Sequence, residues 1–173
     1  PANFVAAMMS DVISALSLTN QVKVSSNSWG DTSNPPSCLL YGTYTAESRL
    51  FDQVVTGSLG AHLPWAHANG NERWLCPPPK DNYNTTLSQA TAKNVISVGS
   101  TNTTDPLGDV LSSFSSFGPT ADGRIKPDVV APGCETGGDH GITTTNNAGG
   151  YSGPGWCGTS FATPQVAGAI VLL

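Results

Sequence analysis

Residues 158–173 read GTSFATPQVAGAIVLL, and they predict a buried helix with a serine at its start. Ser160 lies between small residues, Pro164 follows within one turn, and small apolar residues come next. A hydroxyl at this place meets unpaired backbone N–H groups and the positive end of the helix dipole, which favour developing negative charge. Pro164 fits the first turn because N–H groups there need no intrahelical partner. A serine that only caps a core helix gives the same pattern, so the rest of the chain must separate the two interpretations.

The composition is that of one globular domain with many turns. The chain has 173 residues, a charged fraction of 11%, 19 glycines and 13 prolines, and it is long enough for a substantial core. The formal net charge is −5 and no basic run is present, so the sequence does not favour a nucleic-acid partner. No stretch approaches the roughly 20 apolar residues that cross a bilayer, so we expect no membrane partner.

The cysteines and two glycosylation signals predict an exported protein. Asn-Thr-Thr triplets beginning at Asn84 and Asn102 match the N-glycosylation pattern. The cysteines are Cys38, Cys76, Cys134 and Cys157. They lack the C-x-x-C spacing and the His/Cys grouping of a zinc site, so disulfides in a secreted protein explain them better. Three pairings are possible, and the sequence alone leaves them open.

Apolar periodicity predicts helices that alternate with short strands. Helices are expected over 4–18, over 46–57 and from about Ser160 onward. Extended segments are expected over 21–26, 61–66, 95–99, 113–117 and 127–131, with a glycine-rich loop over 133–156. This alternation predicts an α/β fold with a largely parallel sheet. Sites in such sheets form beyond the carboxyl ends of the strands, where unusual polar and glycine-rich sequences occupy 27–30, 69–72 and 158–160.

Four motifs follow one another over most of the chain. They read NSWG at 27–30, ANGNE at 68–72, SFSSFGP at 113–119 with KPDVVAPG at 126–133, and GTSFATP at 158–164. With this ordered set the chain resembles the subtilisin-like serine peptidases, the subtilase family. The resemblance implies a parallel sheet with helices on both faces, of which this chain would hold only the later strands.

The resemblance implies catalytic roles for Ser160 as nucleophile and Asn71 as oxyanion donor. A serine hydroxyl is a weak nucleophile that needs a base, usually an imidazole oriented by a carboxylate. The oxyanion needs preorganised donors, here the Ser160 N–H and the Asn71 amide. Asn71 would otherwise be a turn residue in an Asn-Gly-Asn stretch. Thr159 would either add a hydroxyl near the oxyanion or cap the helix, and both alternatives stay open.

The resemblance also implies two walls of a substrate cleft. One wall would be Ser28, Trp29 and Gly30, and the facing wall of the specificity pocket would be Ala68, Asn69 and Gly70. The first wall would bind an extended peptide as an added strand, although Trp29 would equally serve as a core aromatic at the sheet edge. Asn69 departs from the small apolar residue expected in its segment. Gln165 stands where many members carry a histidine that is not the catalytic base.

The catalytic aspartate and histidine of the family would lie before the segment in which this chain begins. No Asp-Thr/Ser-Gly or His-Gly-Thr-His-like motif is present, and we expect His62, His67 and His140 in loops or at the surface. The chain is therefore expected to be part of a catalytic domain, inactive alone, with the missing N-terminal part as its partner. The strand over 21–26 would then be an exposed edge. The resemblance implies no organic cofactor. Calcium is frequent in the family, but the sequence contains no carboxylate cluster to which a calcium site could be assigned.

The leading prediction is a secreted serine endopeptidase that acts on peptide or protein substrates through an acyl-enzyme on Ser160. The alternative is a catalytically dead subtilase-like module that binds peptides or proteins, and an intact upstream aspartate and histidine would argue against it. A third possibility is an unrelated secreted binding or structural domain that mimics the motifs. A structure with Asn71 far from Ser160 would favour that third possibility.

Overall fold

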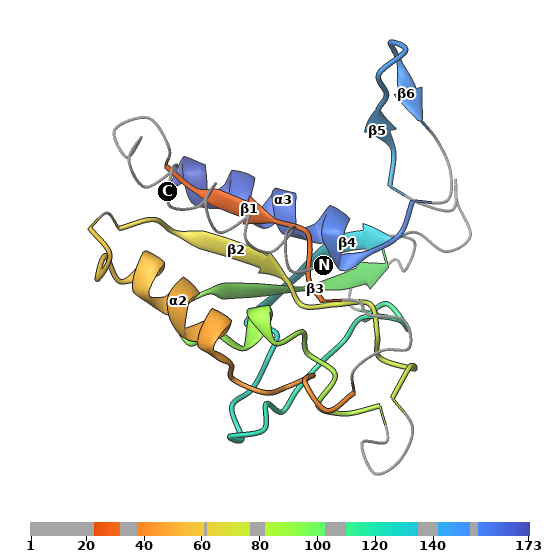
Figure 1. Ribbon diagram of the computed structural model, residues 1–173. Helices are drawn as coiled ribbons and strands as arrows, with labels where there is room; N and C mark the ends of the chain where they lie inside the picture. The colour runs from red at the N-terminus through yellow and green to blue at the C-terminus, as the bar shows by residue number, and fades with distance from the viewer. Residues whose placement is uncertain are drawn as a thin grey trace.

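The computed structural model describes residues 23–31, 38–60, 62–76, 82–102, 110–134, 142–152 and 156–173. Its centre is a parallel sheet of four strands in the order β1-β2-β3-β4. The strands are β1 (Ser25–Asn27), β2 (Trp65–Ala68), β3 (Ile96–Asn102) and β4 (Val129–Cys134). Helix α3 (Thr159–Leu172) crosses one face of the sheet, and α2 (Ala46–Val55) lies with the 3-10 turn η1 (Gln89–Thr91) on the other (Figure 1). The predicted α/β fold is confirmed.

Alternation along β2 supplies both faces of the sheet with core residues. Trp65 joins the cluster on the α2 side, where its ring stacks on Phe51 with 4.8 Å between centroids. Ala66, the next residue, points to the opposite face and packs with Ala162 and Ala167 of α3. These small residues let α3 lie close to the sheet. The fold therefore needs the small-residue helix that the C-terminal sequence predicts.

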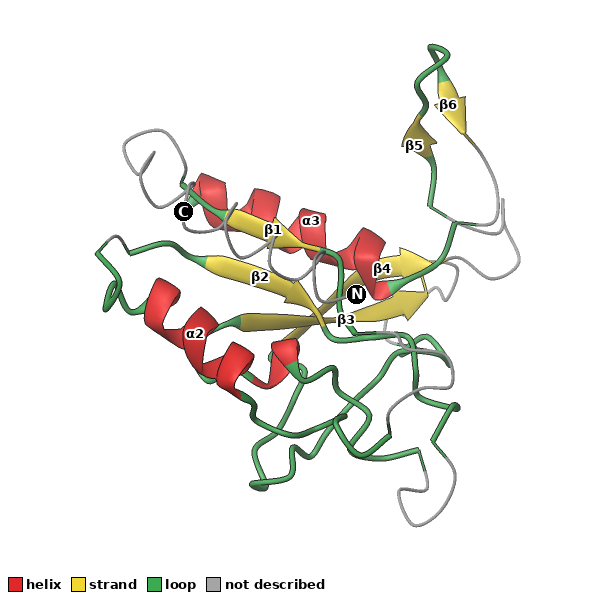
Figure 2. Cartoon of the chain, in the orientation of Figure 1, coloured by secondary structure: helices red, strands yellow, loops and turns green. Residues whose placement is uncertain are grey.

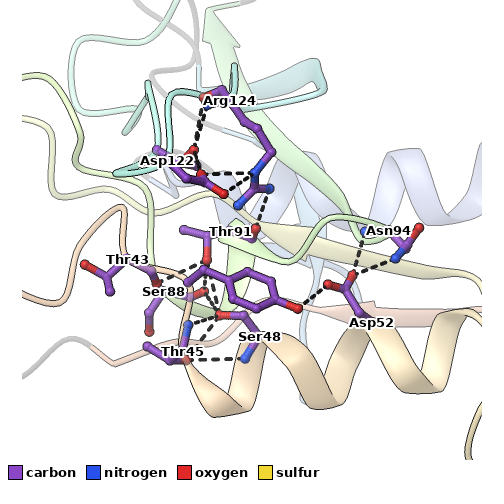
Figure 3. A network of polar contacts seen from close by, with 11 residues as sticks. Thr43, Thr45, Ser48, Asp52, Ser88, Thr91, Asn94, Asp122 and Arg124 are labelled. Atoms are coloured by element: carbon purple, nitrogen blue, oxygen red, sulfur yellow. Dashed lines mark hydrogen bonds and ion pairs between the residues drawn. The ribbon is translucent and has the colours of Figure 1, made fainter.

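Helix α2 is held by a capping box and by a polar network (Figure 3). The Ser48 N–H donates to Thr45 Oγ1 at 3.3 Å, and the Thr45 N–H donates back to Ser48 Oγ at 2.9 Å. Farther along, the Asp52 carboxylate accepts from the Asn94 N–H at 2.6 Å. Arg124 extends the network by donating from Nη1 to the Thr91 carbonyl at 2.7 Å. The network ties α2 to the segment that leads into β3.

Several predicted elements differ from the observed ones. The expected helix over 4–18 lies outside the described residues, and the first strand covers Ser25–Asn27 rather than 21–26. The extended segment expected over 113–117 is a turn followed by irregular chain, because its serines bond to backbone instead of joining the sheet. Ser115 Oγ accepts from the Ser100 N–H at 3.0 Å, and Ser116 Oγ accepts from the Glu72 N–H at 3.0 Å. Within 133–156, β5 (Thr144–Thr145) and β6 (Tyr151–Ser152) form a hairpin that projects from the body (Figure 2).

The two disulfides settle the pairing that the sequence left open. Cys38 is bonded to Cys76, and Cys134 to Cys157. The first links the chain that follows β1 to the chain that follows β2, and the second links the end of β4 to the segment before α3. None of the helices in the described part of the chain has the length and apolarity to span a bilayer.

Candidate active site

Parallel register brings the two predicted walls together at the carboxyl edge of the sheet. Asn27 of β1 is the partner of His67 of β2, so the residues that follow each strand emerge side by side. The N-terminus of α3 reaches the same edge, since Ser28 Oγ donates to the Ser160 carbonyl oxygen at 2.9 Å. Three segments far apart in the sequence thus meet around Ser160.

A pocket of about 60 Å³ lies between these segments. It is lined by Ser28, Trp29, Gly30, Ala68, Gly70, Asn71, Glu72, Leu87, Thr159 and Ser160. The lining includes seven of the eight residues that the sequence analysis assigned to the site, and the exception is Asn69. Asn69 is fully buried behind the wall, where its Nδ2 donates to the Ser116 carbonyl at 2.5 Å.

Asn71 and the first turn of α3 are connected by direct hydrogen bonds. Asn71 Oδ1 accepts from the Thr159 N–H at 2.8 Å and from Thr159 Oγ1 at 3.0 Å. Thr159 Oγ1 in turn accepts from the Gly70 N–H at 3.3 Å. Because Oδ1 is occupied by two donors, the Nδ2 end of the exposed Asn71 amide is turned away from Thr159. Thr159 therefore orients Asn71, a role that neither of the two alternatives for Thr159 anticipated.

Two nitrogen donors border the position that a side chain on Gly158 would occupy. A Cβ placed on Gly158 would lie 3.4 Å from Asn71 Nδ2 and 3.6 Å from the Ser160 backbone nitrogen. The positive end of the α3 dipole points to the same place. Ser160 itself is partly exposed, and its Oγ contacts the Ser28 carbonyl oxygen at 3.4 Å. The arrangement offers a hydroxyl beside a space that suits a negatively charged oxygen.

Trp29 combines the two roles that the sequence analysis left open. It lines the pocket, and its ring also packs edge-on against Phe51 and His67, with centroids 5.8 Å and 5.1 Å apart. Its Nε1 donates to Asn27 Oδ1 at 3.1 Å. The pocket wall is thus continuous with the core on the α2 side of the sheet.

The expectation that His67 lies in a loop or at the surface is wrong. His67 belongs to β2 and is fully buried, and its Nδ1 accepts from Trp65 Nε1 at 3.1 Å. Burial lowers the pKa of His67 to about 4, so the ring is neutral at pH 7. Its aromatic surroundings separate it from Ser160. His62 is exposed in the chain before β2, and His140 lies outside the described residues.

Glu72 places a carboxylate in the pocket wall. Its side chain is buried and accepts from the Asn71 N–H at 2.5 Å, and burial raises its pKa above the ordinary value. A Cβ on Gly70 would lie 2.5 Å from Glu72 Oε2, so only glycine leaves this oxygen room. Burial, followed by the charges of Glu72 and Asp31, raises the pKa of Tyr41 to about 12. Glu72 is thus an acidic group in the pocket wall, and the described residues contain no ion pair to it.

Sequence reasoning missed two contributors to the site, Glu72 and Leu87. Glu72 was visible beside Asn71, but nothing in the sequence showed that its side chain turns back into the wall. Leu87 had no signal, because it reaches the pocket from a loop distant in sequence. Gln165 donates from Nε2 to the Pro132 carbonyl at 2.5 Å, so it ties α3 to β4. The described residues contain no group of three or more His, Cys, Asp or Glu that could hold a metal ion, and no donor set for calcium can be assigned.

Comparisons with known proteins agree with this geometry. The sequence model of the subtilase family matches residues 3–173. The serine protease/ABC transporter B family protein tagD of Dictyostelium discoideum is 44% identical over 71 residues, which cover 36% of this chain and 4% of that protein. The PII-type proteinase of Lactococcus lactis subsp. cremoris is 40% identical over 65 residues, 38% of this chain and 3% of the proteinase. The C5a peptidase of Streptococcus pyogenes serotype M3 is 39% identical over 94 residues, 54% of this chain and 7% of the peptidase. The matched regions are thus a small part of each relative.

Proposed function

This chain belongs to the subtilase family, and from that premise we propose that it supplies the nucleophile and the oxyanion hole of a serine endopeptidase. Ser160 Oγ attacks the carbonyl carbon of a peptide bond, the amine leaves, and water hydrolyses the resulting acyl-enzyme. The names of the relatives, which include serine protease, proteinase and peptidase, support the class of reaction.

The single observation that carries the proposal is the pair of donors beside Gly158. Asn71 Nδ2 and the Ser160 backbone nitrogen lie 3.4 Å and 3.6 Å from the position that a Cβ on Gly158 would occupy. Two donors and a helix dipole, fixed before the substrate arrives, stabilise the oxyanion without reorganising during the reaction. The bonding of Asn71 to Thr159 also argues against the third alternative, a domain that only mimics the motifs.

The substrate would bind as an extended peptide along the first wall of the cleft. Residues 28–30 continue from β1, which is an edge strand of the described sheet. Backbone groups there would pair with the peptide as an added strand. The side chain on the amino side of the scissile bond would then enter the pocket between Gly30 and Gly70.

The base has to come from outside the described residues. Neither described histidine contacts Ser160: His67 is enclosed in the core, and His62 lies before β2. We propose that an imidazole and a carboxylate from the N-terminal part of the same domain complete the site. Two disulfides support an extracellular location for the whole protein.

A catalytically dead module that binds peptides is the second candidate, and it is favoured because no described residue near Ser160 can act as a base. A fluorophosphonate probe on the full protein separates the two, because it labels only an activated serine. We expect labelling of the wild type, none of Ser160→Ala, and peptide hydrolysis by the wild type alone. A wild type that binds peptides but neither reacts with the probe nor cleaves would support the binding module.

A further inference from the structure

The Cys134–Cys157 disulfide joins the end of β4 to the segment that leads into the nucleophile helix. Cys134 is the last residue of β4, and Cys157 stands three residues before Ser160. The two Cα atoms are 4.5 Å apart. The bond therefore lies close to Ser160 along the chain, whereas the Cys38–Cys76 disulfide packs in the cluster of the pocket residue Leu87 and is distant from Ser160 in the sequence.

The backbones that this disulfide joins are already in contact. The Gly158 N–H donates to the Gly133 carbonyl oxygen at 2.9 Å. A Cβ on Gly133 would lie 2.6 Å from the Gly158 oxygen, so glycine is needed for so close an approach. Gln165 adds its hydrogen bond to the Pro132 carbonyl. The disulfide and these two hydrogen bonds thus hold the N-terminal turns of α3 against β4, and only the disulfide is covalent.

A movement of Cys157 and Gly158 would reach the oxyanion hole directly. Thr159 is the next residue, and it orients Asn71 through the 2.8 Å and 3.0 Å hydrogen bonds to Oδ1. A misplacement of about 1 Å in an active site can cost ~10²-fold in rate. The other pocket residues belong to β2, to the segments after β1 and β2, or to the loop that carries Leu87, and the disulfide does not join any of these segments. Loss of the disulfide should therefore lower turnover more than substrate binding.

One cysteine of the pair is exposed to solvent. Cys157 is exposed, whereas Cys134 is only 6% exposed. From this placement we propose that Cys134–Cys157 positions the nucleophile and makes turnover depend on the redox state. The inference rests on the proposed function. A thiolate of an external dithiol attacks Cys157 Sγ, and Cys134 leaves as a thiolate that takes up a proton. The second thiol of the reagent then displaces Cys157, leaving two protein thiols and an oxidised, cyclic reagent.

Two matched variants of the full protein isolate this bond. In Cys38→Ser/Cys76→Ser the bond between Cys134 and Cys157 is the only one of the two described disulfides left for dithiothreitol to reduce. In Cys134→Ser/Cys157→Ser this disulfide is already absent. kcat and KM for a chromogenic peptide are measured before reduction, after it and after reoxidation. Thermal unfolding and the free thiol count are followed in the same samples, at a temperature where each variant is folded.

In the first variant we expect reduction to lower kcat ~10-fold or more, with KM changed less than about threefold, and reoxidation to restore kcat. In Cys134→Ser/Cys157→Ser, kcat should be low before any reduction, and dithiothreitol should not change it. If Cys134→Ser/Cys157→Ser does not fold, the reversible loss of kcat in Cys38→Ser/Cys76→Ser tests the inference by itself. Unchanged kcat in a folded first variant, with both thiols shown to be free, would overturn the inference alone. No hydrolysis and no Ser160-dependent labelling of the oxidised wild type would overturn the proposed function and the inference with it.

Discussion

Replacing Asn71 by aspartate tests whether this side chain is a donor to the oxyanion or only a turn residue. Asn71 Oδ1 accepts from the Thr159 N–H at 2.8 Å and from Thr159 Oγ1 at 3.0 Å. An aspartate oxygen can accept both hydrogen bonds, so the local structure is kept. The Nδ2 donor, however, becomes a second oxygen that carries negative charge. Asn71→Asp therefore changes the chemistry of the site while preserving its shape.

The expected effect on rate is large. Losing one oxyanion donor costs about 10²–10³ in kcat, or about 2.7–4 kcal/mol, a range measured at an oxyanion-hole asparagine of a subtilisin. Repulsion between aspartate and the oxyanion adds to that loss, so we expect Asn71→Asp to lose at least ~10³-fold. Asn71→Ala should lose ~10²–10³-fold in kcat. It should also lower the free energy of unfolding by about 1–3 kcal/mol, since the buried Thr159 N–H and hydroxyl would lose their acceptor.

The assay is steady-state hydrolysis of a chromogenic peptide by the full protein, with urea unfolding of the same variants. We expect the aspartate variant to unfold within about 1 kcal/mol of the wild type and to lose activity mainly in kcat. If Asn71 is only a turn residue, aspartate is a good substitute, since it is common in turns. A folded Asn71→Asp enzyme with kcat within about threefold of the wild type would refute the reasoning.

Three further substitutions probe the pocket, the contact between β4 and α3, and the core. A lysine side chain in the pocket would meet the Glu72 carboxylate. Glu72→Gln keeps an acceptor for the Asn71 N–H but removes the charge, so the ratio of kcat/KM for lysine to that for leucine on the amino side of the scissile bond should fall ~10-fold or more. Gly133→Ala places a Cβ 2.6 Å from the Gly158 carbonyl oxygen, so Tm and kcat should both fall, and an unchanged kcat would contradict the contact. Burial lowers the pKa of His67 from 6.5 to about 4, so the neutral ring is the folded form. The free energy of unfolding should therefore have its highest value above about pH 6.5 and fall by ~3 kcal/mol toward pH 4. Urea unfolding at a series of pH values measures this dependence, and His67→Asn should make it weaker.

The parts of the fold that the sequence predicts well are those set by local periodicity. Helix α2 follows from apolar spacing over 46–57, and β3 from β-branched residues that begin at Val95. Helix α3 follows from its small apolar residues, which only a closely packed sheet can cover. In each case the signal lies within the element itself. The meeting of 27–30 and 69–72 was also foreseeable, because parallel strands end at the same edge.

The parts that the sequence does not predict depend on contacts between distant segments. The strand expected to end at 66 continues to Ala68, and alternation then places His67 on the same face as Trp65 and buries it. The disulfide pairing depends on which loops the sheet brings together. Leu87 enters the pocket only because its N–H pairs with the Asn69 carbonyl at 3.0 Å. No local sequence pattern predicts any of these contacts.

The measurement that tests the central claim most directly is mass spectrometry of the acyl-enzyme. The full protein is mixed with a slowly deacylating ester substrate, quenched in acid and digested. We predict one acyl group for each active molecule, on the peptide that contains Ser160, and none in Ser160→Ala. An acyl group on another residue, or equal acylation of the wild type and Ser160→Ala, would contradict the assignment of Ser160 as the nucleophile.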